Sequence, residues 1–323
     1  MFDYQQNISN EYSQYINGNY SGIHLSKFDQ GVRASAYIFT SITGIIGNTL
    51  VLIIFYRTPA LRVPVNYYLI NIAVIDICTC VFRQSINVIG ILTRGWPYGK
   101  GWCDLNGFIQ TLFYLLTVMS LLAIAISRYM VIVYRRAVSK KQVGISIAII
   151  WIYSLIHCFL PILKWNRYFY HKHEFACLPD YKYEISYPLY CVIADFLIPM
   201  ICINWCYARI YLTTRNHSLK LFKRSIRLEK NRYNVKLTRN MFYVFIAFVV
   251  CYLPYSISML FILPIGISLP SWYIWLSGWL VNLNSSVNPV LYYFIFRRFR
   301  KLYNSMLCQC NWKIVPEATI RVR

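Results

Sequence analysis

Three charged side chains stand inside long apolar stretches of this 323-residue chain: Asp76, Arg83 and Asp195. A charge in apolar surroundings is costly, so it usually serves ion binding, ligand binding or pairing. Asp76 needs either a cation or polar partners around a neutral carboxyl, and the sequence leaves both interpretations open. Arg83 and Asp195 either face a ligand cavity or pair with neighbours, or Arg83 extends its charged end to the membrane interface.

The sequence lacks the motifs of common hydrolytic and phosphate-transfer sites. It has no His-Glu-x-x-His, no Gly-rich phosphate loop, and no Ser or Cys nucleophile with an evident base. We therefore predict that the chain is not an enzyme.

The composition is that of a membrane protein. Hydrophobic residues make up 58% of the chain and charged residues 14%, and the mean hydropathy is +0.43. A soluble domain typically carries about 25% charged residues. The aromatic content of 18% fits a protein whose rings gather at the lipid headgroups. A disordered protein, a collagen and a small disulfide scaffold are excluded.

Apolar stretches predict seven spans, each needing roughly 20 mostly apolar residues. The first five are Ala36–Tyr56, Val65–Leu92, Leu105–Ser127, Val143–Leu163 and Ile185–Ala208. The uncharged run Asn240–Phe296 is too long for one span, and Pro264, Gly266 and Pro270 divide it into a sixth and a seventh. The fold class is therefore an all-α membrane protein, a seven-transmembrane helix bundle with a short amphipathic eighth helix.

The eighth helix is predicted over residues 294–307. Phe296, Phe299, Tyr303 and Leu307 fall on one stripe at helical spacing, with basic residues around it. This pattern is typical of a helix on the membrane surface.

Basic residues set the orientation. Most of the 33 Lys and Arg residues fall after the first, third and fifth spans or in the tail, where the only acids are Glu229 and Glu317. Basic loops stay on the cytosolic side, so the N-terminus is expected outside, at the plasma membrane. The net charge of +22 then reflects topology and contact with anionic lipids, not nucleic-acid binding.

Several modifications follow from this orientation. The outer N-terminal segment holds sequons at Asn7 and Asn19. Cys103 and Cys177 both face the oxidising side, which favours a disulfide between them. Cys308 and Cys310 follow the last helix on the cytosolic side and are candidates for lipidation.

Landmark residues in every span make the chain resemble class A, rhodopsin-like G-protein-coupled receptors, from about residue 34 to 310. The matching residues are Gly47-Asn48, Asn71 to Asp76, Trp96 with Cys103, Ser127-Arg128-Tyr129, Trp151, Pro199 with Tyr207, Phe248 with Cys251 to Pro254, Asn288 to Tyr292, and Phe299. The resemblance implies an extracellular disordered segment at 1–33, a receptor domain at 34–293, the surface helix at 294–307 and a cytosolic tail at 308–323. It also implies a receptor that binds an extracellular ligand and activates heterotrimeric G proteins by outward movement of helix six.

The resemblance assigns two groups of residues. A sodium ion beside Asp76 would be bound with Thr117, Asn284, Ser285 and Asn288. G-protein coupling and activation fall to Arg128, Tyr129, Tyr207, Phe248, Tyr252, Pro254, Asn288, Pro289 and Tyr292.

The chain departs from the family pattern at residues that hold the inactive state. Ser127 replaces the acid before Arg128, and Asn234 and Lys236 stand where many members place a glutamate. We expect raised basal signalling. Tyr252 replaces the usual tryptophan of helix six, so an aromatic ring that could act as a packing switch is kept at this position.

Two ligand-anchoring residue types are absent from this chain, which narrows the range of expected ligands. Gln110 stands where amine receptors carry an aspartate, and Asn282 stands where opsins carry the lysine that binds retinal covalently. A biogenic amine anchored in the usual way and covalent retinal are therefore not expected, and no cofactor other than sodium is. The predicted small-molecule pocket comprises Arg83, Gln110, Tyr114, Asp195, Tyr255 and Asn282. The outer loop before Cys177 and the helix-five sequence place the chain near the opsin and melatonin-receptor branches.

Two other interpretations remain. A transporter or channel would usually show internal repeats, which this chain lacks. A heptahelical protein that binds a ligand without signalling would account for the departures at Ser127 and Tyr252.

Overall fold

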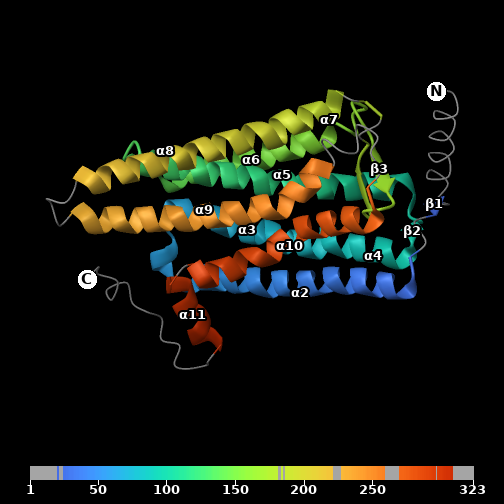
Figure 1. Ribbon diagram of the computed structural model, residues 1–323, viewed down its shortest axis with the longest axis horizontal. Coiled ribbons are helices and arrows are strands. Elements are labelled where there is room, and N and C mark those ends of the chain that lie inside the picture. Colours follow the sequence, from blue (N-terminus) through green and yellow to red (C-terminus); the bar gives the residue numbers. More distant parts are fainter. Residues whose placement is uncertain are drawn as a thin grey trace.

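The computed structural model describes residues 20–21, 25–180, 183–184, 186–220, 227–258, 269–295 and 297–307. Within this part of the chain seven long helical rods pack side by side (Figure 1). The rods are α2 (Lys27–Arg57), helix two (α3 Tyr67–Cys78, η3 Thr79–Gln84, α4 Ser85–Thr93), α5 (Gly99–Ile132), α6 (Lys140–Phe159), helix five (α7 Ser186–Tyr190, η4 Cys191–Leu197, α8 Ile198–Lys220), α9 (Arg227–Ile257) and α10 (Ser271–Ile295). The predicted bundle is confirmed.

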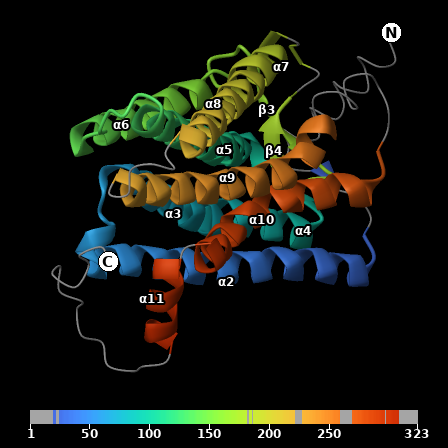
Figure 2. The same ribbon diagram turned by 60° about the vertical axis from the view of Figure 1, so that its left-hand side comes forward.

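Shorter elements lie at the two ends of the bundle. Two strands pair as a hairpin at one end, and α11 (Arg297–Leu307) lies across the direction of α2 at the other end (Figures 1 and 2). The hairpin strands are β3 (Tyr168–His171) and β4 (Ala176–Pro179), antiparallel with Tyr170 opposite Cys177. A second short pair joins β1 (Tyr20–Ser21) to β2 (Gly95–Trp96), and short 3-10 turns at Pro59–Leu61 and Pro64–Asn66 precede helix two.

Among the described residues, five rods are long and apolar enough to cross a membrane by length and composition. They are Lys27–Arg57, Pro64–Thr93, Gly99–Ile132, Lys140–Phe159 and Ser186–Arg215, and α9 adds the shorter apolar stretch Phe242–Ile257. The outward faces are apolar too. On α6, Ile149, Ile152 and Ile156 recur at helical spacing and are 60%, 57% and 61% exposed, as expected for side chains that face lipid.

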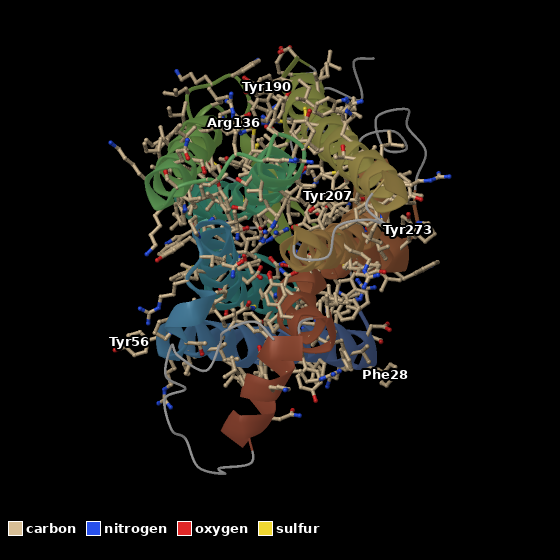
Figure 3. All side chains as sticks on the ribbon, turned by 90° about the vertical axis from the view of Figure 1, so that its left-hand side faces the viewer. Phe28, Tyr56, Arg136, Tyr190, Tyr207 and Tyr273 are labelled. Atoms are coloured by element: carbon tan, nitrogen blue, oxygen red, sulfur yellow. A yellow bond between two sulfur atoms is a disulfide. The ribbon has the colours of Figure 1, made fainter. Side chains whose placement is uncertain are left out.

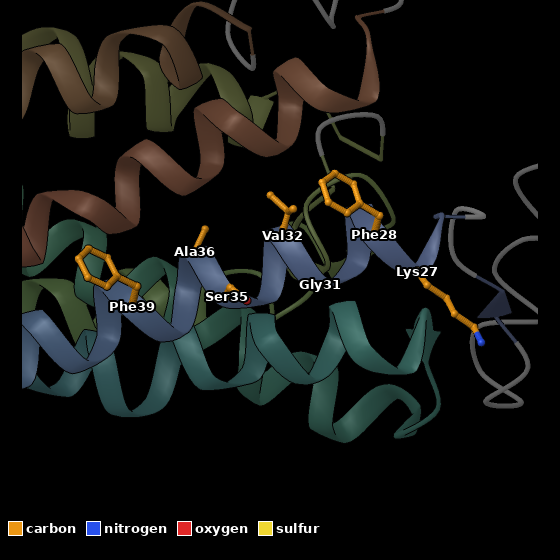
Figure 4. A pocket seen from close by; sticks show the side chains of 7 residues that line it. All are labelled: Lys27, Phe28, Gly31, Val32, Ser35, Ala36 and Phe39. Carbon is orange, nitrogen blue, oxygen red and sulfur yellow. The ribbon is translucent and has the colours of Figure 1, made fainter.

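The outer part of α2 shows the same lipid-facing character. Figure 4 shows a shallow open depression along it, where Phe28, Val32 and Phe39 lie on one side of the helix. Because Phe28 is 79% exposed and Phe39 is 67% exposed, this depression is an apolar surface and no enclosed binding site.

Several helix ends depart from the predicted apolar stretches. The first helix begins at Lys27, before the apolar stretch that starts at Ala36, because the side chain of Ser26 accepts a hydrogen bond from the backbone of Asp29 at 3.0 Å and caps it. The surface helix begins at Arg297, not at residue 294, because Phe294 and Ile295 complete α10. Capping and turn geometry, unlike hydropathy, decide these boundaries.

Small residues and buried amides hold the rods together. A Cβ added at Gly47 would lie 2.8 Å from the Pro289 ring, so α2 and α10 touch closely there. Asn48 donates to the carbonyl of Ser285 at 2.9 Å. Asn71 donates to Ser120 at 2.9 Å and accepts from the Trp151 indole at 3.0 Å, joining helix two to α5 and α6.

Candidate functional site

A cavity of about 100 Å³ lies between the rods beneath the hairpin. Helix two, α5, α6, η4, α9, α10 and β4 all contribute to its walls. Five of the six predicted pocket residues line it: Arg83, Gln110, Tyr114, Asp195 and Tyr255. Asn282 does not; its amide donates to the carbonyl of Gly278 at 2.8 Å, and its neighbour Val281 reaches the cavity.

The hairpin is fixed over the cavity by its contacts with α5. Cys103 and Cys177 form a disulfide, as the sequence predicts. The side chain of Asn106 accepts a hydrogen bond from the backbone of Cys177 at 2.7 Å. Gly107 leaves room for the Tyr168 ring, which an added Cβ would overlap. Strand β4 therefore forms a fixed roof.

The hairpin also carries a buried acid, Glu174, which sequence reasoning missed. Its side chain is 8% exposed and accepts a hydrogen bond from the Tyr255 hydroxyl at 2.9 Å. Burial raises the pKa of Glu174 to about 7, against the smaller opposite effects of Tyr255 and Arg83. No property of the loop sequence marks this acid, because the disulfide and the hairpin determine its place.

Arg83 begins a polar row across the cavity wall. Its Nε donates to the side-chain oxygen of Gln110, whose amide donates to Asn87 at 2.7 Å. Arg83 is 9% exposed. Of the three interpretations of Arg83, two hold together: it lines the cavity and it is paired with Gln110.

Asp195 lies in a network with α6. Its Oδ2 is 2.8 Å from Nε2 of His157, and its Oδ1 accepts from the Tyr153 hydroxyl at 2.9 Å. His157 also lines the cavity. Tyr153 and His157 are four residues apart, so two polar rings on one face of an apolar helix were the available signal.

A column of aromatic rings leads from the cavity along α9 into the core of the bundle. The rings of Tyr114 and Tyr252 are 5.7 Å apart, and Tyr252 stacks on Phe248 at 4.2 Å. Pro254 lies inside α9, two residues beyond Tyr252. A helix loses a backbone hydrogen bond at such a proline and can bend there.

Asp76 lies deeper, between helix two and α10. Its Oδ2 accepts a hydrogen bond from the amide of Asn288 at 2.8 Å. The Ser285 side chain also forms a hydrogen bond with the Asp76 carboxyl group. Within the described part of the chain, Oδ1 of Asp76 and the side-chain oxygen of Asn284 have no hydrogen-bond partner. The Thr117 hydroxyl donates to the carbonyl of Phe113 at 2.8 Å instead of to this cluster. Its oxygen lone pairs remain available to accept.

Part of the group assigned to G-protein coupling, including Arg128 and Tyr207, lies toward the α11 end of the bundle, whereas Tyr252 lines the cavity. Arg128 is 4% exposed and interacts electrostatically with Tyr207. Tyr207 lies in the middle of the bundle when viewed from this end, whereas Tyr56 points outward (Figure 3). The hydroxyl oxygen of Ser127, the residue before Arg128, lies 3.4 Å from the Tyr68 hydroxyl.

The remaining members of this group pack around α9 and α10. The Tyr129 ring lies 4.9 Å from Trp205, and Tyr207 packs on Phe242 at 5.1 Å. Pro289 is inside α10, and Tyr292 lies 6.0 Å from Phe299 of α11.

Some predicted residues cannot be placed. Asn7, Asn19, Cys308 and Cys310 lie outside the described residues, as do the side chains of Asn234 and Lys236.

The comparisons with known proteins agree with this geometry. Residues 47–292 match the family described as 7 transmembrane receptor (rhodopsin family), and the chain belongs to this family. It is 27% identical to Opsin-3 of Mus musculus over 274 residues, 83% of this chain and 68% of that protein. It is 27% identical to Melatonin receptor type 1B-B of Danio rerio over 283 residues, 84% of this chain and 80% of that protein.

A solved structure, squid rhodopsin, has the same fold. The TM-score is 0.76 at 22% identity, covering 90% of this chain and 93% of the other. The match to the 7 transmembrane receptor family over residues 47–292 makes the protein a rhodopsin-like membrane receptor and not an enzyme.

Proposed function

We propose that this chain is a plasma-membrane receptor that binds a small extracellular ligand beneath the hairpin. It activates a heterotrimeric G protein by moving the inner part of α9 outward. The observation that carries the proposal is the aromatic column, because it links the cavity directly to the helix that must move.

The column supplies a route for the signal. A ligand that displaces Tyr252 also displaces Phe248, since the two rings stack at 4.2 Å. Pro254 stands beside this pair in the same helix. Stacked rings and a proline bend together give α9 two discrete arrangements that a ligand can bias.

The cavity favours a small aromatic molecule with hydrogen-bonding groups. Tyr114, Tyr252 and Tyr255 supply ring faces, while Gln110 and Arg83 supply polar contacts. Melatonin is the first ligand to test, because several relatives are melatonin receptors. Covalent retinal is not proposed, because Asn282 offers no amine at the position where opsins form their Schiff base.

A sodium ion beside Asp76 is part of the proposal. Oδ1 of Asp76 and the side-chain oxygen of Asn284 have no hydrogen-bond partner within the described residues, so they suit a hard cation. Ser285, Asn288 and Thr117 would supply further oxygens. These side chains would hold the ion, which would neutralise the buried carboxylate.

The α11 end is proposed to face the cytosol. The described basic residues that follow α2 and α5 lie there, which would place this end next to the anionic leaflet and the N-terminus outside. Arg128 and Tyr207 then lie where an inserted G-protein helix would meet them.

The test is nucleotide exchange by purified heterotrimeric G proteins with the full chain in lipid, with and without melatonin. Exchange above the empty-membrane level that Arg128→Ala abolishes and Arg136→Ala leaves unchanged supports the proposal. Arg136 is an exposed arginine of the same face and is the matched control. Ligand binding without exchange, under any ligand or G protein tried, would instead support a binding protein that does not signal, the candidate favoured by Ser127 and Tyr252.

A further inference from the structure

Three side chains with metal-binding chemistry meet at one wall of the cavity. His157 comes from α6, and Cys191 and Asp195 come from η4. One ligand atom from each lies within 4.8 Å of the other two. Nε2 of His157 is 2.8 Å from Oδ2 of Asp195 and 4.0 Å from Sγ of Cys191.

The donor set is the one that zinc prefers. Imidazole nitrogen, thiolate sulfur and carboxylate oxygen are its usual protein ligands, whereas calcium and magnesium take oxygen alone. With ordinary zinc bond lengths, neighbouring ligand atoms of a tetrahedral site are roughly 3.3–3.7 Å apart. The two measured separations lie on either side of this range, and the third separation is no more than 4.8 Å, so shifts of about 0.5–1 Å would form the site.

The surroundings fix these ligands in place. The Tyr153 hydroxyl bonds to Oδ1 of Asp195 at 2.9 Å, leaving Oδ2 to face His157. The Tyr190 ring stacks on the His157 ring at 5.3 Å and 18°. Such second contacts orient metal ligands in known sites.

We propose that His157, Cys191 and Asp195 bind a Zn²⁺ ion whose fourth coordination position opens into the ligand cavity. Binding requires Cys191 to lose its thiol proton and Nε2 of His157 to give up any hydrogen it carries. The thiolate and the carboxylate then balance the two positive charges of zinc, so the filled site is neutral, as its burial requires.

The open position gives the ion a function in recognition. All three ligands line the cavity, and zinc sites with three protein ligands accept a fourth from solvent or substrate. A ligand with a nitrogen or anionic oxygen donor would coordinate the ion directly. The ion would also clamp α6 to helix five.

The first experiment titrates the purified full chain in detergent with Zn²⁺ and with Co²⁺, whose bond to a thiolate gives a charge-transfer absorption. We expect one ion per chain. Cys191→Ser and His157→Gln should weaken binding roughly tenfold or more, and Tyr153→Phe should weaken it by about tenfold. Cys202→Ser, on the same rod and also free, should bind as the unaltered chain does.

A second measurement uses the unaltered chain and does not depend on variants that fold. Zn²⁺ should slow alkylation of Cys191 by a maleimide and leave alkylation of Cys202 unchanged, as read from peptide masses. Absence of stoichiometric zinc, or equal protection of both cysteines, would overturn the proposal. Neither experiment requires a G protein, so the zinc site and the receptor function fail or succeed separately.

Discussion

Replacing Glu174 by Gln should remove most of a pH-dependent loss of stability. Burial raises the pKa of this carboxyl from 4.5 to about 7, so the folded state holds its proton more tightly than the unfolded state does. Stability from this group is complete below about pH 4.5 and is lost as the pH rises through 7. At about 1.4 kcal/mol for each pKa unit, the full loss is about 3 kcal/mol.

The assay is unfolding of the purified chain in detergent between pH 5 and pH 8.5. The unaltered chain should become less stable toward high pH, and Glu174→Gln should show a much flatter profile. Glu184→Gln, at an exposed acid near the same end of the bundle, should follow the unaltered chain.

His173, the residue before Glu174, changes the stability with pH in the opposite direction. Burial, together with the positive charges of Lys172 and Arg33, lowers the pKa of His173. Stability from His173 therefore increases as the pH rises. It is present in every variant and cancels when their profiles are compared. A Glu174→Gln chain that keeps the pH slope of the unaltered chain would refute the burial argument.

Three further predictions concern packing, signalling and the ion. Gly90→Ala places a methyl group 2.5 Å from a hairpin carbonyl and should lower the unfolding free energy by about 1–3 kcal/mol. Gly101→Ala has open space around the added methyl group, and its unfolding free energy should stay within about 0.5 kcal/mol of that of the unaltered chain. Ser127→Asp restores the acid before Arg128 and should lower basal nucleotide exchange; exchange equal to that of the unaltered chain would contradict the restraint argument. NaCl should raise the unfolding midpoint of the unaltered chain more than KCl does, and Asp76→Asn should abolish the difference; a difference that survives in the variant would exclude sodium at Asp76.

Hydropathy predicts the bundle because lipid imposes one requirement on every span, about 20 apolar residues with an internally bonded backbone. The same physics makes intramembrane charges visible, and Asp76, Arg83 and Asp195 all lie in buried polar clusters. Helix ends follow other rules. Ser26 extends the first helix through a capping hydrogen bond that hydropathy does not register.

The site is less predictable because its walls depend on local helix geometry. Arg83 and Asp195 lie in the π-helical turns η3 and η4, which change the direction in which a side chain projects. Arg83 and Asp195 nevertheless line the cavity as predicted, whereas Asn282 is not among its lining residues. The position of Glu174 depends on a hairpin that is fixed by a disulfide between two cysteines 74 residues apart in the sequence. No local sequence pattern encodes this contact.

The fixed hairpin has a kinetic consequence. The disulfide, the Asn106 hydrogen bond and the close seating on Gly90 and Gly107 all resist displacement of this roof. In the receptor function proposed above, a ligand beneath this roof would have to leave past a hairpin that resists displacement. Its dissociation would therefore be slower than from a cavity with a mobile cover.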